Sequence, residues 1–522
     1  MKSRTTTSPK DDVSLTYRIF RTFFQFLTNI WFREVNVVDD EQISDDAGVL
    51  FITWHPNGLI DPMIMASCLS GKLTTLVQHN LFKIPFVGLL FRMAGVVAIG
   101  TSKDSDALFT FGPKNAELLS MVAHEIAKGG QVLMFPEENT HGKSGVQKIR
   151  SGAARVMLEA IQIAKEYGYP QPRIIPIGLH YSDSNRFRER AAIVLERPME
   201  LPVVPEQVEL EKKWVDDVTS SIEIEMKRAN LSKTSWEERT LIWKGRSVVY
   251  AEKQRQAGVS LSRLTYAESI LGARRIRAGW EYMMLHEPEK TQVLASECEA
   301  HFDQLDQLGL SPYDVDARPK TLTSSGFFKI VASWLWSGVW MLGLVTWGAL
   351  IGNYVPYKAQ SILEWMTKKS NVDDSLQGSI KVLSSMVMFP LWWGLLSSMI
   401  VWLLLDTTSP VFLALSGHAL LKYVTHLPSF GIFIFFMLFW PLTARAHLKL
   451  YARLVRSNRR LKQWKAWNND GTDWEKLIAK QQQLASQLVN IGANLVLPGD
   501  PEWIDPPVGK DDVHAVQLRE QG

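Results

Sequence analysis

Cysteine is nearly absent from this chain of 522 residues, which contains only Cys68 and Cys298. The two lie in unrelated contexts and cannot form a disulfide framework, so the sequence suits a reducing compartment. A strong excess of one charge is also missing. The formal net charge is +3, which gives no argument for a nucleic-acid partner. Residues 1–12 are polar, and no short apolar core with a small-residue cleavage site follows them, so we expect no secretory signal peptide.

Motifs for metals and nucleotides are lacking as well. Neither a His-Glu-x-x-His nor a paired Cys-x-x-Cys spacing occurs, so no metal site is predicted. Gly142-Lys143-Ser144 looks like the end of a phosphate-binding loop, but Glu137 stands five residues before Gly142, where that loop requires glycine. We therefore expect no metal and no bound cofactor.

His55 and Asp61 are the most informative residues that are present. The apolar residues 48–54 are too few for a helix and predict a buried strand, with His55 at its carboxyl end, where α/β sheets tend to place chemistry. Pro56-Asn-Gly58 predicts a turn, after which residues 59–69 can begin a helix. An imidazole paired with a carboxylate can act as a general base near neutral pH. A histidine that only caps the turn is an equally open interpretation of this pair alone.

The segment from residue 48 to 200 alternates between short apolar runs and helical patterns, which predicts an α/β fold with a sheet covered by helices. The expected strands are 49–54, 73–78, 95–99, 131–135, 173–179 and 192–195, and the expected helices are 60–69, 114–128 and 152–166.

Further polar residues follow the later strands. The strand that starts at Gln131 runs into a polar turn with Glu137, Thr140 and His141. Arg150 precedes the helix 152–166, whose amino terminus favours an anion. The strand 173–181 leads to Phe187-Arg188-Glu189-Arg190.

Taken in order, these motifs resemble the glycerolipid acyltransferase family that forms phosphatidic acid. The likeness covers residues 48–200 and is closest to the fungal-type glycerol-3-phosphate and dihydroxyacetone-phosphate acyltransferases. As in those proteins, five residues separate His55 from Asp61, a Thr-His pair follows Phe-Pro-Glu, and a basic residue precedes Ser151-Gly152. Two positions depart from the pattern: Glu138 stands in place of a glycine, and Thr101, two residues before Lys103, in place of a phosphate-binding arginine.

The resemblance implies transfer of an acyl group from acyl-CoA or acyl-carrier protein, as co-substrate, to glycerol 3-phosphate or dihydroxyacetone phosphate. It makes His55 the catalytic base and Asp61 its partner, and it implies six substrate-binding residues: Lys103, Glu137, Thr140, His141, Arg150 and Arg188. One alternative is a lysophosphatidate acyltransferase with the same motifs and a larger acceptor. The other is a non-catalytic, lipid-binding membrane scaffold, which would predict that the His/Asp pair is replaced.

Nineteen tryptophans and long apolar runs indicate a membrane protein. Residues 327–351 and 382–405 are each long enough to cross a bilayer, and 411–442 could form two short crossings or a re-entrant hairpin. The basic residues in 445–465 mark the cytoplasmic side. We expect an integral membrane protein whose catalytic domain faces the cytoplasm, in the endoplasmic reticulum of a eukaryote or the inner membrane of a prokaryote.

Five regions are predicted. Residues 1–40 contain an amphipathic helix in 13–35, which suits either the membrane interface or packing on its own domain. The catalytic domain, 41–204, and a charged helical extension, 205–325, precede the transmembrane region, 326–445. The basic tail, 446–522, should contain a last helix in 470–497 and a loose end rich in Pro and Asp.

Overall fold

The computed structural model describes residues 14–39, 43, 47–78, 97–99, 113–137, 141–183, 185–233, 235–258, 265–315, 324–370, 373–415, 417–418, 423, 426–468 and 473–519. The chain forms two compact units. The first comprises Met1–His301, Asp373–Gly378 and Gln482–Gly522, and the second Phe302–Val372 and Ser379–Gln481.

The first unit is built on a sheet whose seven described strands lie in the order β1-β7-β6-β2-β5-β3-β4. The strands are β1 (Phe32–Val38), β2 (Val49–Ile52), β3 (Leu73–Gln78), β4 (Val97–Ile99), β5 (Gln131–Met134), β6 (Arg173–Tyr181) and β7 (Glu189–Leu195). All neighbouring pairs are parallel except β6 and β7, which are antiparallel. The predicted α/β fold is thereby confirmed, with a mixed sheet.

Strand β2 lies in the middle of this sheet, between β5 and β6, and all four of its residues are buried. A strand buried on both faces reads as a continuous apolar run, which is why its sequence predicts it. Because β2, β5 and β6 are parallel, their carboxyl ends meet at one edge of the sheet. The polar turns that follow these strands are therefore brought together there.

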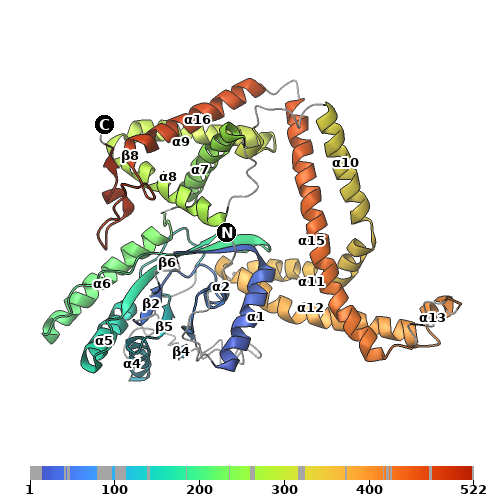
Figure 1. Ribbon diagram of the computed structural model, residues 1–522, viewed down its shortest axis with the longest axis horizontal. Coiled ribbons are helices and arrows are strands. Elements are labelled where there is room, and N and C mark those ends of the chain that lie inside the picture. The colour runs from blue at the N-terminus through green and yellow to red at the C-terminus, as the bar shows by residue number, and fades with distance from the viewer. Residues whose placement is uncertain are drawn as a thin grey trace. The chain divides into compact units, whose positions relative to one another are not determined.

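Helices flank the sheet: α2 (Ile60–Cys68), α4 (Pro113–Ala127), α5 (Gly152–Tyr167) and α6 (Val208–Ala229) (Figure 1). The helix α5 ends where predicted because Gly168 takes up the left-handed conformation, with φ of 69°, that favours glycine after a helix.

Helix α1 (Leu15–Trp31) is shorter than the predicted 13–35. The chain turns at Phe32 into β1, an edge strand that pairs with β7 and was not predicted. The apolar pattern of α1 continues into the apolar residues of β1. The sequence therefore does not show where the helix ends and the strand begins.

The two faces of α1 have different surroundings. One buries Tyr17, Phe20 and Phe24 against its own unit, and Thr28 Oγ1 lies 2.9 Å from Ser67 Oγ of α2. The other exposes Leu15, Ile19, Phe26 and Ile30, which are 73, 52, 57 and 38% accessible. These four positions fall on one side of a helix with 3.6 residues per turn. Helix α1 thus packs on its own domain, and it also presents an apolar stripe of the kind found at membrane interfaces.

The predicted helical extension is present as α7 (Trp236–Ala257), α8 (Tyr266–His286) and α9 (Pro288–Gln307), followed by a 3-10 turn at Pro312–Asp314. Near the carboxyl terminus come α16 (Trp474–Asn494), the short antiparallel strands β8 (Leu495–Val496) and β9 (Gln517–Leu518), and a 3-10 turn at Asp512–His514.

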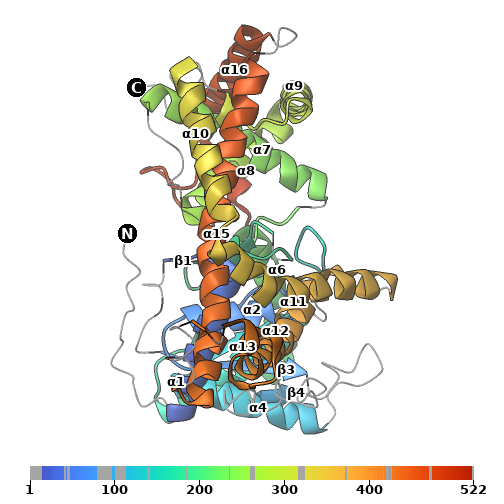
Figure 2. The same ribbon diagram turned by 90° about the vertical axis from the view of Figure 1, so that its right-hand side faces the viewer.

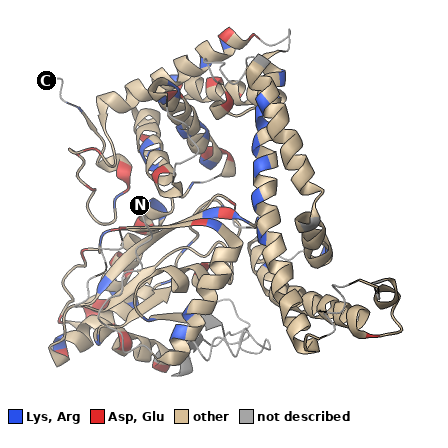
Figure 3. Cartoon of the chain, turned by 45° about the vertical axis from the view of Figure 1, so that its right-hand side comes forward, with Lys and Arg blue, Asp and Glu red and all other residues tan. Residues whose placement is uncertain are grey.

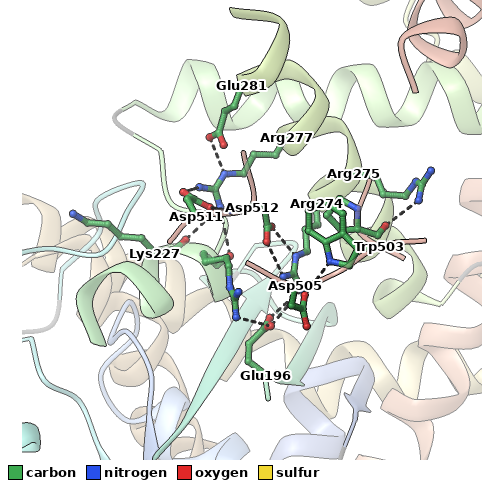
Figure 4. Close-up of polar contacts among 12 residues, drawn as sticks. Glu196, Lys227, Arg274, Arg275, Arg277, Glu281, Trp503, Asp505, Asp511 and Asp512 are labelled. Carbon is green, nitrogen blue, oxygen red and sulfur yellow. Dashed lines mark hydrogen bonds and ion pairs between the residues drawn. The ribbon is translucent and has the colours of Figure 1, made fainter. Parts of the chain in front are cut away.

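The carboxyl-terminal segment 498–519 is docked on the first unit, so the prediction of a loose end was wrong. Arg274 of α8 pairs with Asp512 at 2.8 Å, and Arg277 pairs with Asp511 at 2.5 Å (Figure 4). The sequence shows only a Pro- and Asp-rich tail, because the arginines that bind it lie more than 200 residues earlier.

The second unit consists mainly of α10 (Ser324–Met341), α11 (Leu344–Lys369), α12 (Asp374–Leu405) from Ser379 on, α13 (Pro410–Leu415) and α15 (Ser429–Trp467). Helix α10 and the amino-terminal part of α11 run along α15 (Figures 1 and 2). Among the described residues, two helices are long and apolar enough to cross a membrane, Ser375–Leu405 and Ser429–Trp467. The pair α10 and α11 passes the same test only if it counts as one broken span, bent by 64°.

The predicted span 327–351 meets a break in the structure, because Gly343 leaves the helical conformation between α10 and α11; the pair is either one broken span or a re-entrant loop. The segment 411–442 was predicted to form two short crossings or a re-entrant hairpin. Its residues 429–442 form the start of α15, which continues unbroken through Pro441 into the basic stretch 445–465. Lysines and arginines follow one another along the far half of this helix (Figure 3).

Candidate active site

His55 and Asp61 meet at the carboxyl edge of the sheet, as predicted. The two lie on either side of a tight turn between β2 and α2, and His55 Nδ1 is 2.8 Å from Asp61 Oδ2. The imidazole is stacked on Phe135, with ring centroids 4.1 Å apart, which fixes its plane. The histidine side chain is 20% exposed, whereas that of Asp61 is fully buried. Because Nδ1 faces Asp61, Nε2 is the ring nitrogen that could accept a proton from a substrate.

Three protein donors hold the Asp61 carboxylate. Besides the His55 ring, the Asn57 amide donates to Oδ2 at 2.7 Å and the Tyr181 hydroxyl donates to Oδ1 at 2.7 Å. Asp61 also lies in the first turn of α2, where the helix dipole favours a negative charge. A carboxylate held by these donors can orient the imidazole and stabilise its protonated form.

Tyr181 is a functional candidate that the sequence did not reveal. It ends β6, 120 residues after Asp61, and it stacks on Phe32 with ring centroids 5.7 Å apart. Burial and the adjacent Asp61 carboxylate raise the pKa of Tyr181 well above its usual value. The hydroxyl is therefore a permanent donor to Asp61. A tyrosine at the end of an apolar strand gives no such signal by itself.

The Glu137 carboxylate holds the backbone of His55 in place. Its Oε2 accepts the backbone N–H of His55 at 2.8 Å, and its Oε1 lies 2.8 Å from His141 Nε2 and 2.6 Å from the Gln147 amide. The side chain is 1% exposed. These contacts leave the carboxylate occupied by protein donors, so they favour a positioning role over direct binding of an acceptor hydroxyl.

His141 completes this network. Its backbone N–H donates to the His55 carbonyl at 3.3 Å, and the Lys143 amide donates to His141 Nδ1 at 3.3 Å. Because Nδ1 accepts, Nε2 must carry the proton that is given to Glu137. His141 and Glu137 therefore brace the catalytic turn as a unit, and His141 is only 11% exposed.

The two predicted arginines have different surroundings. Arg150 lies beside the Glu137 turn, where Glu137 and Ile149 form an isolated bridge and the Arg150 amide donates to Pro136 O. It stands two residues before α5, near the helix amino terminus. The Arg188 guanidinium instead donates to the carbonyls of Asn29 and Phe32 at the end of α1. Those contacts indicate that Arg188 fastens α1 to the turn between β6 and β7.

Lys103 and Thr140, as well as Thr101 and Glu138, lie outside the described residues. Neither cysteine is suited to nucleophilic attack at neutral pH. Burial raises the pKa of Cys68 to about 12 and that of Cys298 to about 11, so both remain thiols. In the described part of the chain, no cluster of His, Cys, Asp and Glu could hold a metal ion.

Residues 34–180 match the family model described as Acyltransferase. A segment of 91 residues is 30% identical to an uncharacterised acyltransferase of Schizosaccharomyces pombe and covers 17% of this chain. That segment amounts to only 13% of the yeast protein's length.

The structure was also compared with solved structures. It is similar to the crystal structure of the 1-acyl-sn-glycerophosphate acyltransferase PlsC from Thermotoga maritima, with a TM-score of 0.29 and 16% identity over 39% of this chain and 76% of that one. The family match includes β1 from its third residue on, β2, the His55–Asp61 turn, Glu137 and β6 up to its penultimate residue. Residues 34–180 are thus similar to the Acyltransferase family.

Proposed function

We propose that this protein is a membrane-bound O-acyltransferase that moves a fatty acyl group from acyl-CoA, or acyl-carrier protein, to glycerol 3-phosphate or dihydroxyacetone phosphate. The observation that carries the proposal is the His55–Asp61 pair, with its buried carboxylate and its partly exposed imidazole, within the acyltransferase-family domain.

In the reaction, His55 Nε2 takes the proton from the acceptor hydroxyl as that oxygen attacks the thioester carbonyl carbon. Asp61 stabilises the imidazolium that forms. When the tetrahedral intermediate collapses, the C–S bond breaks, and the thiolate leaves with the proton from His55. The products are an ester and a free thiol. An acyl-enzyme is unnecessary, and both cysteines remain protonated near pH 7.

A phosphorylated acceptor is supported by the position of Arg150. Arg150 stands two residues before α5, and a positively charged residue next to the N–H groups of a helix start is an arrangement that binds anions well. Lysophosphatidate, which bears the same phosphate and an acyl chain, is the alternative acceptor, and the exposed apolar stripe of α1 would suit its chain.

Purified protein in lipid nanodiscs, incubated with one labelled acyl-CoA and each acceptor in turn, tests this function. We expect labelled lysophosphatidate or its dihydroxyacetone analogue to form with wild-type protein and not with His55→Ala. Labelled phosphatidate from lysophosphatidate alone would favour the alternative acceptor. Absence of product with all three acceptors and both types of donor would refute the proposal.

We further propose that the catalytic domain and the carboxyl terminus lie on the same, cytoplasmic, side of the membrane. Residues before 302 and after 481 belong to one compact unit, which requires an even number of crossings between them. The basic stretch 445–465 supports the cytoplasmic side. Tags at residues 10 and 515 should be cut together by protease added to the cytoplasmic face of sealed vesicles. Protection of only one tag would contradict the topology.

A further inference from the structure

The opening turn of α12 belongs to the compact unit of the acyltransferase domain, although it begins a helix that is apolar enough to cross a membrane. Asp373 caps this helix, because its Oδ1 accepts the Ser375 amide at 2.8 Å. Asp373 also lies near enough to His141 for an electrostatic interaction between the two side chains. The sequence gives no reason to expect residues 373–378 beside the catalytic turn, more than 300 positions after His55.

Gly378 makes the closest approach. Its amide donates to Asn185 Oδ1 at 3.1 Å, which ties α12 to the turn between β6 and β7. A Cβ added at Gly378 would lie 2.7 Å from Ile60 Cδ1, 2.9 Å from Asn57 Oδ1 and 3.2 Å from Asn185 Oδ1. Carbon atoms in contact normally stay about 3.5–4.0 Å apart, so any side chain here would push on the catalytic turn.

That turn holds the catalytic pair. The backbone N–H of Asn57 donates to Asp61 Oδ2, the same oxygen that His55 Nδ1 faces, and Ile60 immediately precedes Asp61. A displacement of Asn57 or Ile60 by a few tenths of an ångström would therefore reach the hydrogen bonds that orient the imidazole. Both side chains are fully buried, so they have little room to move away.

We propose that the opening turn of α12, residues 373–378, forms a wall of the active site, and that Gly378 is a positioning residue for the turn 57–61. The inference rests on the proposed function for its kinetic readout. It adds to the site a segment that lies outside the acyltransferase-family match, 34–180. Catalysis then depends on how this membrane-region helix begins.

Gly378→Ala tests the proposal in full-length protein in nanodiscs, with Gly394→Ala as the matched control. Gly394 lies in the same helix, and a Cβ there meets no atom within 4 Å. We expect kcat of Gly378→Ala to fall about tenfold while both KM values stay within about twofold, because substrate contacts are unchanged and the base is misplaced. Gly394→Ala should retain wild-type kcat.

A second substitution separates positioning from general damage to the helix. Ile60→Val removes the Cδ1 atom that the new methyl group would meet. The double variant Ile60→Val/Gly378→Ala should therefore recover most of the kcat lost by Gly378→Ala, which a merely destabilised helix would not do. Should Gly378→Ala fail to fold, Asn185→Ala removes the acceptor of the Gly378 amide and should lower kcat about threefold.

A readout that needs no turnover keeps this test independent of the proposed reaction. Modification of His55 by diethyl pyrocarbonate, followed by mass spectrometry, should be several-fold faster in Gly378→Ala than in Gly394→Ala, since the imidazole is held less firmly. Equal modification rates in the two folded variants, or equal kcat values, would overturn the inference. Wild-type protein without acyltransferase activity would refute the proposed function alone.

Discussion

Removing the Tyr181 hydroxyl should weaken catalysis without disturbing the packing around it. Tyr181→Phe keeps the ring that stacks on Phe32 and deletes only the donor that lies 2.7 Å from Asp61 Oδ1. Asp61 has no solvent exposure, so water cannot replace that donor without a rearrangement. The carboxylate would keep the Asn57 amide and the His55 ring, both of which lie on its other oxygen.

The expected size follows from the energy of such a bond. A hydrogen bond to a charged group contributes about 1.5–3 kcal/mol. If about half of this energy holds Asp61 in the orientation that the transition state requires, about 0.8–1.5 kcal/mol is lost and kcat falls about four- to twelvefold. KM for both substrates should change little, because the deleted hydroxyl bonds to Asp61, whose side chain is fully buried.

Tyr169→Phe is the matched control, since Tyr169 is 40% exposed and lies before the amino end of β6, whereas Tyr181 ends that strand. A Tyr181→Phe enzyme with wild-type kcat would refute the role assigned to this hydroxyl.

Three further predictions follow from the same contacts. His55→Ala should abolish turnover in a folded protein, while Asp61→Asn should retain a trace; near-normal turnover of His55→Ala in the nanodisc assay would rule out the mechanism. Glu137→Gln should mainly lower kcat, because the new amide group would turn a donor toward either the His55 N–H or the Gln147 N–H. Arg150→Ala should mainly raise the KM of the phosphorylated acceptor. The reverse pattern in steady-state kinetics would exchange the two roles. Burial raises the pKa of Asp512, but the charges of Arg274, Arg228 and Arg277 and the hydrogen bond from Arg274 together outweigh burial and hold the pKa below its usual value. The ion pair with Arg274 therefore contributes stability above about pH 4 that is lost as the pH falls through the lowered pKa; melting temperatures of Asp512→Asn should lie below wild type at pH 7, with the difference shrinking toward pH 3.

The central strands could be predicted from the sequence because burial on both faces leaves a continuous apolar run. Residues 49–52, 131–134 and 173–181 show this pattern and form β2, β5 and β6. Strand β1 was not predicted because it pairs on one side only and directly follows an amphipathic helix. The ordered carboxyl-terminal segment was not predicted for another reason: an aspartate-rich end is compatible with disorder until its arginine partners are known.

The residues of the candidate site also differ in whether a local sequence pattern reveals them. His55, Asp61 and Glu137 each stand just after a strand in a recognisable turn, so local pattern and family resemblance together identify them. Tyr181 and Gly378 act, in this structure, through contacts with partners 120 or more residues away, and neither has a distinctive neighbourhood in the sequence. Such long-range contacts depend on the order of the strands in the sheet and on which later helix packs against it. The periodicity of apolar residues in the sequence predicts neither.

The order of the chain limits how the bent pair α10 and α11 can lie in a membrane. The chain leaves the first unit after His301 and is back in it at Asp373, so on the proposed topology the segment between returns to the side from which it started. One broken span would leave it on the other side. Two spans need about 20 apolar residues each, whereas α10 has 18 residues and α11 carries Pro356 and Lys358 in its middle. We therefore propose that this pair, with its 64° bend, is a re-entrant hairpin.

If α10 and α11 form a re-entrant hairpin, the start of α10 and the end of α11 should be accessible from the same side of the membrane. Single cysteines introduced as Ser325→Cys and Lys369→Cys should react alike with a membrane-impermeant maleimide applied to one face of sealed vesicles. Cys68 and Cys298 provide little background, because burial raises the pKa of both thiols to about 12 and about 11. Labelling of Ser325→Cys from one face and of Lys369→Cys only from the other would show that α10 and α11 form a single span. Residues 302–372 would then cross the membrane once, and the opening turn of α12 could not lie beside the catalytic turn.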